Sequence, residues 1–219
     1  MARDVLESVA NARALYYDFF AGLFLYELLS ERSNVLLKQV KILKENILDE
    51  RDSVHFELLE SELERKGIEQ ILREYTHTFI LPFAVPQDNV PLPQKNKKEK
   101  KEMSNSQIML YLSHYLEGHL NGKALLQART LTKQSTFRLN TQECKESEEH
   151  LGFLLLLMRY LLLSPNEGDR ALSVQVVNEL VIPLGDFVVD ALIQREDLSY
   201  YASVGYLLQS FLNVERSLK

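Results

Sequence analysis

The residues best suited to holding a charged ligand lie in one short segment that runs directly into apolar residues 151–163. Its charged and titratable members include Glu146, Glu148, Glu149 and His150. Carboxylates accept strong hydrogen bonds from cationic groups, and an apolar helix beside them offers hydrophobic contact. This combination favours binding of a peptide that carries both positive charge and apolar side chains.

An ordinary helix start accounts for the same residues without a ligand. The Ser147 hydroxyl is a good N-cap, and Glu148 and Glu149 would sit at the positive end of the helix dipole. The apolar run that follows is typical of a central helix, and it is shorter than the roughly 20 residues that span a bilayer. The segment therefore leaves both interpretations open.

The histidines give no pattern that is typical of a metal site. His114 and His119 are five residues apart, which places them about 140° apart around a helix, whereas zinc-binding helices use a spacing of four. His55 and His77 stand alone and are expected to be surface or packing residues. We predict no metal, no cofactor and no catalytic residue, so the chain is not expected to be an enzyme.

The single cysteine, Cys144, excludes an internal disulfide framework and is typical of a reducing compartment. A base lies six residues further on, at His150, but nothing else in the sequence supports a nucleophilic pair.

Composition and charge narrow the class of protein. A hydrophobic content of 46% over 219 residues is enough for a proper core. The net charge of −6 argues against a nucleic-acid partner and favours positively charged ones. Charged residues, among them Asp4, Glu7 and Arg13, interrupt the apolar N-terminal segment, so we expect no signal peptide and no stable membrane insertion. These features predict a cytoplasmic protein.

Hydrophobic spacing is helical throughout, which predicts an all-α fold. We expect a single bundle of about eight helices, with the 147–163 helix at its centre. Its core-facing residues are predicted to be Leu154, Leu157, Met158 and Leu161. The further helices are expected near 5–23, 37–48, 50–64, 68–81, 105–134, 169–194 and 197–215.

One segment is typical of a linker. Residues 82–104 contain four prolines and a lysine run at 95–101, so we expect an exposed, mobile loop. This loop would separate N-terminal helices 1–81 from C-terminal helices 105–219 within a single domain, 1–219.

Three motifs in order resemble the TorD/DmsD family of cytoplasmic redox-enzyme maturation chaperones. The first is an aromatic helix that ends before a proline, residues 75–82, with Tyr75 and Phe79 one turn apart. The second is the acidic step into the apolar helix, residues 146–150. The third is residues 181–187 followed by 200–212, which are similar to the closing helix pair of the family. The chain departs from the family pattern in having Glu149 where aspartate is usual and in lacking tryptophan.

The resemblance implies a chaperone that binds the twin-arginine signal peptide and the body of a molybdoenzyme catalytic subunit, and that delays export until the cofactor is inserted. It assigns the signal-peptide site to Glu146, Glu148, Glu149, His150, Tyr75 and Phe79. The glutamates would supply charge, the histidine a hydrogen-bonding and pH-sensitive group, and the two rings an aromatic wall.

Several points stay open at this level. Clients of the family include trimethylamine-oxide and dimethyl-sulfoxide reductases and formate dehydrogenases, and nothing in the sequence chooses among them. The chain is expected to be a monomer or an exchange-prone dimer. The alternative is a helical protein–protein interaction module without signal-peptide specificity, in which the acidic step is only a helix cap.

Overall fold

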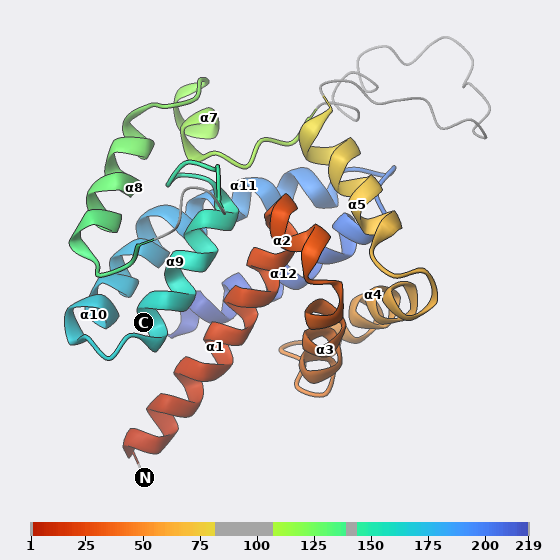
Figure 1. Cartoon of the computed structure of the whole chain (residues 1–219), viewed down its shortest axis with the longest axis horizontal. Coiled ribbons are helices and arrows are strands. Elements are labelled where there is room, and N and C mark those ends of the chain that lie inside the picture. The colour runs from red at the N-terminus through yellow and green to blue at the C-terminus, as the bar shows by residue number, and fades with distance from the viewer. Residues whose placement is uncertain (1, 82–106, 139–143, 219) are drawn as a thin grey trace.

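The structure is a computed structural model that describes residues 2–81, 107–138 and 144–218, with side chains from residue 7 onward. Every regular element in these ranges is helical, which confirms the all-α prediction (Figure 1). The elements are α1 (Ala2–Phe24), α2 (Tyr26–Glu31), α3 (Ser33–Lys44), α4 (Asp52–Lys66), α5 (Glu69–Tyr75), the π-helical turn η1 (Thr76–Ile80), α7 (Leu112–Glu117), α8 (Lys123–Gln134), α9 (Leu151–Leu163), α10 (Glu167–Val176), the π-helical turn η2 (Val177–Val181), α11 (Ile182–Ile193) and α12 (Tyr200–Ser217).

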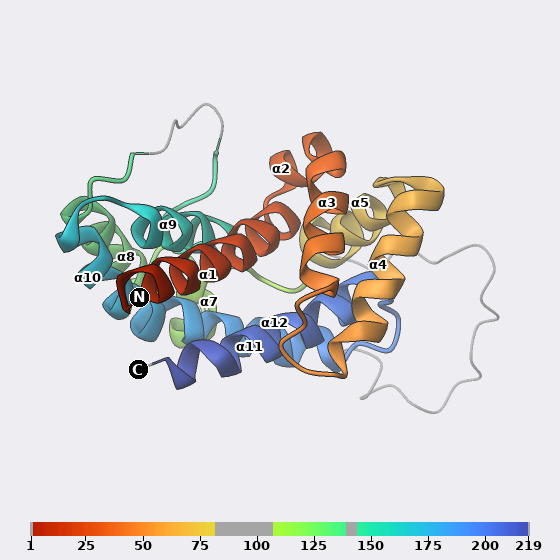
Figure 2. The same cartoon turned by 90° about the horizontal axis from the view of Figure 1, so that it is seen from below.

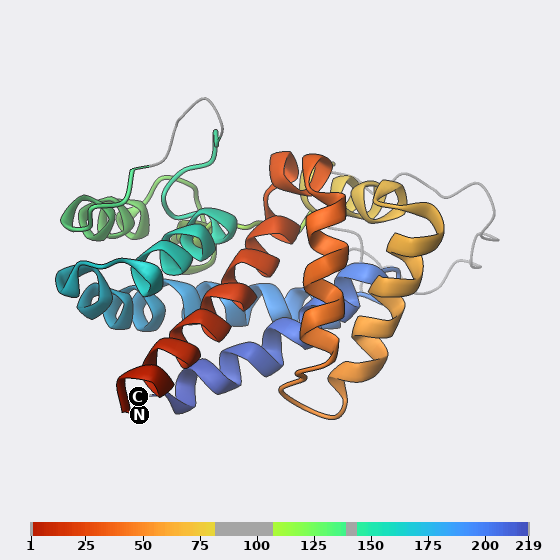
Figure 3. The same cartoon turned by 60° about the horizontal axis from the view of Figure 1, so that its bottom comes forward.

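Helix α9 packs along α1 in the middle of the bundle (Figure 3). The four residues that we predicted to face the core, Leu154, Leu157, Met158 and Leu161, are fully buried, which confirms the prediction. A side chain at Gly152 would collide with the Leu25 side chain, so this glycine lets the start of α9 approach the end of α1. The apolar character of α9 thus reflects packing inside the bundle.

The other helices surround this pair. Helices α11 and α12 pack against each other, as do α3 and α4. Figures 1 and 2 show α7, α8 and α10 at one end of the molecule and α3, α4 and α5 at the other. One hydrophobic cluster contains residues from both the part before residue 81 and the part after residue 107.

The prediction of one continuous helix at 105–134 is wrong. Residues 107–111 are not helical, and α7 and α8 are separated by a short connection. Helix α7 ends because Gly118 adopts the left-handed conformation at φ 75°, and Asn121 in the same connection has φ 61°. Periodicity alone did not reveal the non-helical segment.

The predicted start of the central helix at residue 147 is also wrong. The Tyr111 and His150 backbones form an isolated antiparallel bridge. The Leu151 N–H donates to the Leu110 carbonyl over 2.8 Å, and the Glu149 carbonyl accepts from the Leu112 N–H over 3.4 Å. Because this pairing keeps residues 149–150 extended, α9 begins at Leu151.

Two expectations about the remaining segments differ in their outcome. The bounds of the predicted helices leave breaks at Gly67 and at residues 164–168; the first is confirmed, with Gly67 at φ 70°, and the second is shorter than predicted, because α10 begins at Glu167. The predicted loop at 82–104 lies outside the described residues. No helix in the described ranges is both long and apolar enough to cross a membrane.

Candidate functional site

The candidate site is built on the point where α1 ends. The hydroxyl of Tyr201 donates to the Leu23 carbonyl over 2.6 Å, and that of Tyr75 donates to the Phe24 carbonyl over 3.3 Å. The last carbonyls of a helix have no partner within it, so these two phenols stabilise the helix end. They also fix α5 and α12 against the same corner of the molecule.

Aromatic rings fill this corner. The Tyr75 and Phe79 ring centres are 5.0 Å apart, as expected for residues one turn apart, and Phe79 meets Tyr201 edge-on at 4.9 Å. Tyr26, at the start of α2, lies 5.6 Å from Tyr75 and is 43% exposed. Tyr75 and Phe79 are therefore largely core residues, and Tyr26 carries the cluster to the surface.

A partly open pocket of about 240 Å³ lies against this cluster. It is lined by Tyr26, Tyr75, Phe79, Ile80, Gln107, Ile108, Met109, Leu110, Tyr111, Glu146 and His150. The pocket thus brings together four residues of the predicted site, Tyr75, Phe79, Glu146 and His150. They come from two segments that are about 70 residues apart in the sequence. Glu148 and Glu149 do not line it.

Glu146 is the carboxylate of the pocket. The Tyr111 hydroxyl donates a hydrogen bond to it. Burial, followed by the hydrogen bond to Glu146 and its negative charge, raises the pKa of Tyr111, so the phenol stays protonated as a donor. Glu146 forms no ion pair with any residue of the described ranges, which leaves its charge available to a cationic ligand.

Glu149 has a different role. Its side chain is fully buried, and its carboxylate accepts hydrogen bonds from the Ser113 N–H over 2.6 Å and from the Asn121 N–H over 3.2 Å. These bonds tie the start of α7 and the connection to α8 to the start of α9. The geometry gives Glu149 a positioning role behind the pocket.

His150 is the N-cap of α9. Its Nδ1 accepts from the Gly152 N–H over 3.1 Å, which places the ring proton of the neutral imidazole on Nε2. Burial lowers the pKa of His150 to about 3. The expectation of a pH-sensitive group near neutral pH therefore does not hold, because the ring has too little water around it to accept a proton. The ring lies edge-on to Tyr111, with the ring centres 4.9 Å apart.

The other residues of the acidic segment lie outside the pocket. Glu148 pairs with Arg129 of α8 over 3.1 Å. The predicted cap, Ser147, is wrong, since its buried hydroxyl has no hydrogen-bond partner and His150 caps the helix. Burial raises the pKa of the Cys144 thiol, which disfavours the thiolate that a nucleophile requires. Across residues 2–81, 107–138 and 144–218 no group of three or more potential ligands could hold a metal.

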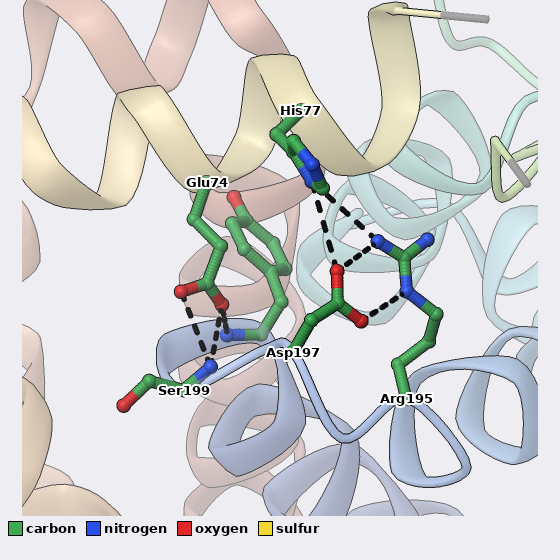
Figure 4. A network of polar contacts seen from close by, with 6 residues as sticks. Glu74, His77, Arg195, Asp197 and Ser199 are labelled. Atoms are coloured by element: carbon green, nitrogen blue, oxygen red, sulfur yellow. Dashed lines mark hydrogen bonds and ion pairs between the residues drawn. The ribbon is translucent and has the colours of Figure 1, made fainter. Parts of the chain in front are cut away.

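A polar network behind the aromatic cluster fixes the helix that carries it (Figure 4). The Glu74 carboxylate accepts from the Ser199 N–H over 3.1 Å and from the Tyr201 N–H over 2.6 Å, at the start of α12. Beside it, the Arg195 guanidinium donates to Asp197 over 2.6 and 2.7 Å. Because Glu74 precedes Tyr75, this cap sets the position of one pocket wall.

Sequence reasoning missed Tyr26, Ile80 and the wall formed by residues 107–111. The sequence carries no clear signal for that wall, because residues 108–112 are all apolar by type. The alternation of an extended segment is seen only in the structure, where Ile108, Leu110 and Leu112 are buried and Met109 and Tyr111 are half-buried. No signal marks Tyr26 either, because its neighbours continue the apolar pattern of α1.

Comparison with known protein families agrees with the resemblance seen in the sequence. Residues 102–187 match a family model described as the nitrate reductase delta subunit. The match covers less than half of the chain and includes Tyr111, Glu146 and His150 of the pocket. No match was found among curated proteins, and none among solved structures.

Proposed function

We propose that this chain, whose match over residues 102–187 supports its resemblance to the redox-enzyme maturation chaperones, binds the twin-arginine signal peptide of a molybdoenzyme subunit. Binding of the peptide, and of the body of the immature subunit, would take place in the cytoplasm and delay export until the cofactor is inserted. The observation that carries the proposal is the pocket that joins an aromatic cluster to Glu146, a carboxylate without an ion pair among the described residues.

The pocket suits a guanidinium group. The Glu146 carboxylate can accept from its N–H groups, and a charge-assisted hydrogen bond of this kind is about twice as strong as a neutral one. The exposed ring of Tyr26 offers a face on which a guanidinium can stack. Ile80 and Phe79 provide the apolar contact that the hydrophobic part of a signal peptide requires.

The size of the pocket favours side chains over a whole small molecule. Small-molecule and cofactor sites enclose about 300–1,000 Å³. At about 240 Å³ and open to solvent, this pocket accommodates one or two side chains of a longer ligand that continues across the surface. A peptide meets that description.

Calorimetric titration of a synthetic peptide, with two consecutive arginines followed by an apolar segment, tests the proposal. Glu146→Gln keeps the acceptor for Tyr111 but removes the charge, and we expect it to weaken binding by about tenfold, or 1.4 kcal/mol. Tyr26→Ala should weaken binding several-fold through the lost ring. Tyr26 is exposed, and Glu146 is half-buried but changes only from a carboxylate to an amide of the same shape, so the folded state should persist in both variants.

Glu148→Gln is the matched control, because it removes the same charge from a residue that pairs with Arg129 outside the pocket. Its affinity should equal that of the wild type. If the wild type does not bind the peptide, or if all three variants bind it equally well, the chain is better described as a helical interaction module. Mass spectrometry of the proteins that a tagged copy retains from its native cytoplasm would then name the client.

A further inference from the structure

The pocket wall formed by residues 107–111 is an extended segment. Tyr111 has φ −122° and ψ 128°, and the side chains before it alternate, with Ile108 and Leu110 buried and Met109 half-buried. All five residues line the pocket, so the pocket follows the whole segment. At about 3.3 Å per residue, the wall is about 13 Å long.

The first end of this wall is fastened to the turn η1. The Gln107 side-chain amide donates to the Phe79 carbonyl over 2.5 Å, and the Ile108 N–H donates to the Thr78 carbonyl over 2.9 Å. The last carbonyls of a helix have no partner within it, so the wall satisfies two groups that η1 leaves free. The residue that follows Phe79 in η1 therefore lies at the Gln107 end of the pocket.

The two ends of the pocket differ in their chemistry. At the Gln107 end is Ile80, an apolar residue of the lining that is 47% exposed. At the other end is Glu146, which accepts a hydrogen bond from the Tyr111 hydroxyl. Of the described residues that line the pocket, only Glu146 carries a charge, because burial keeps His150 neutral. An apolar end and an acidic end are thus separated by the wall of about 13 Å.

The pocket is too small to enclose a helix. An α-helix about 13 Å long and 10–12 Å across occupies roughly 1,000–1,500 Å³, several times the pocket volume of about 240 Å³. An extended chain needs less room, and every second side chain of it points to the same side. Such a chain can lie along the wall and place its side chains in the pocket one after another.

We propose that the ligand binds in an extended conformation along residues 107–111, with a cationic side chain at Glu146 and an apolar side chain at Ile80. The inference rests on the proposed function and adds the conformation of the peptide and the spacing of its two contacts. Four residues of an extended chain span about 13 Å, and because four is an even number both side chains face the pocket. A helical ligand would need about eight or nine residues to cover the same length.

The test is a series of synthetic peptides that contain one arginine and one leucine, placed three to nine residues further on, with serine elsewhere. Their affinities are measured by competition with a labelled peptide of two arginines and an apolar segment. We expect the highest affinity at a separation of four, and an affinity about five- to tenfold lower at three or five, where the leucine points away from the pocket. Proline halfway between the two residues is incompatible with a helix, and should change the affinity of the separation-four peptide by about twofold at most.

A pair of variants locates the apolar contact. Ile80→Ser should weaken binding of the separation-four peptide by about five- to tenfold and remove the preference for that separation. Ile42→Ser is the matched control, because Ile42 of α3 is 49% exposed and does not line the pocket. It should bind every peptide as the wild type does, and both variants should keep the fold because both side chains are about half exposed.

An optimum at seven to nine residues, or an affinity that does not depend on the separation, would overturn this inference. Equal affinities of Ile80→Ser and Ile42→Ser would overturn it as well. In each case, binding of the Arg-Arg peptide by the wild type and its weakening in Glu146→Gln would leave the proposed function standing. Failure of the wild type to bind the Arg-Arg peptide would overturn both.

Discussion

Truncation of Glu149 to alanine should destabilise the fold, and the structure shows which bonds are lost. Its fully buried carboxylate is the acceptor for two backbone N–H groups, those of Ser113 and Asn121. Glu149→Ala removes the acceptor and leaves both donors unpaired. The resemblance to the chaperone family predicts a ligand contact at this position, whereas the buried geometry predicts a loss of stability.

The two donors contribute unequally. The Ser113 N–H is in a fully buried residue, so losing its partner should cost about 1–3 kcal/mol. The Asn121 N–H is partly buried, and water can replace some of its bond, so a smaller cost is expected there. The sum, about 2–4 kcal/mol, corresponds to a fall in Tm of about 5–15 °C for a chain of this length.

Thermal and urea unfolding, followed by circular dichroism, measure this effect. Glu148→Ala is the matched control, because it applies the same truncation to the adjacent residue, whose exposed pair with Arg129 should contribute about 0–1 kcal/mol. The reasoning would be refuted if Glu149→Ala and Glu148→Ala had the same free energy of unfolding. It would also be refuted if Glu149→Ala lost peptide affinity while its Tm stayed that of the wild type.

Three further predictions concern the frame around the pocket. Glu74→Ala removes the carboxylate that caps α12 and should lower the free energy of urea unfolding by about 1–2 kcal/mol; an unchanged value would contradict the capping role. Burial keeps His150 neutral in the folded state, so the unfolded chain binds a proton there at higher pH, near its usual 6.5. This contribution to stability is fully present above that pH and is lost as the pH falls toward 3. His150→Asn can still cap α9, so its free energy of unfolding in urea should fall less between pH 7 and 5 than that of the wild type. Gly152→Ala should destabilise the fold by about 1–3 kcal/mol, because the new Cβ would lie 2.5 Å from the Leu25 side chain. Gly22→Ala meets no atom within 4 Å and should raise the Tm. A higher Tm for Gly152→Ala than for Gly22→Ala would exclude close packing of α1 and α9 at Gly152.

The sequence predicted those features that depend on neighbours along the chain. The burial of α9 could be predicted because nearly all of its residues are apolar, and the pairing of Tyr75 with Phe79 because they are one turn apart. The cap of α9 could not, since Ser147 is as good a cap by type as any residue in the segment. The bridge between Tyr111 and His150 decides where the helix begins, and it joins residues far apart in sequence.

The same distinction explains why the acidic segment was only partly understood. By type and position, Glu146, Glu148 and Glu149 are interchangeable. Their hydrogen-bond partners distinguish them. Glu146 accepts from a phenol at the pocket, Glu148 pairs with an arginine on α8, and Glu149 accepts from two backbone N–H groups.

Since those partners come from residues 111–129, a substitution at Glu149 reaches the pocket through the position of Tyr111 and the start of α7. Peptide affinity and stability should therefore fall together at Glu149, and separate at Glu146, where we propose that the carboxylate contacts the ligand directly. A pair of titrations on these two variants, each normalised to the folded fraction, distinguishes a residue that builds the pocket from one that binds in it.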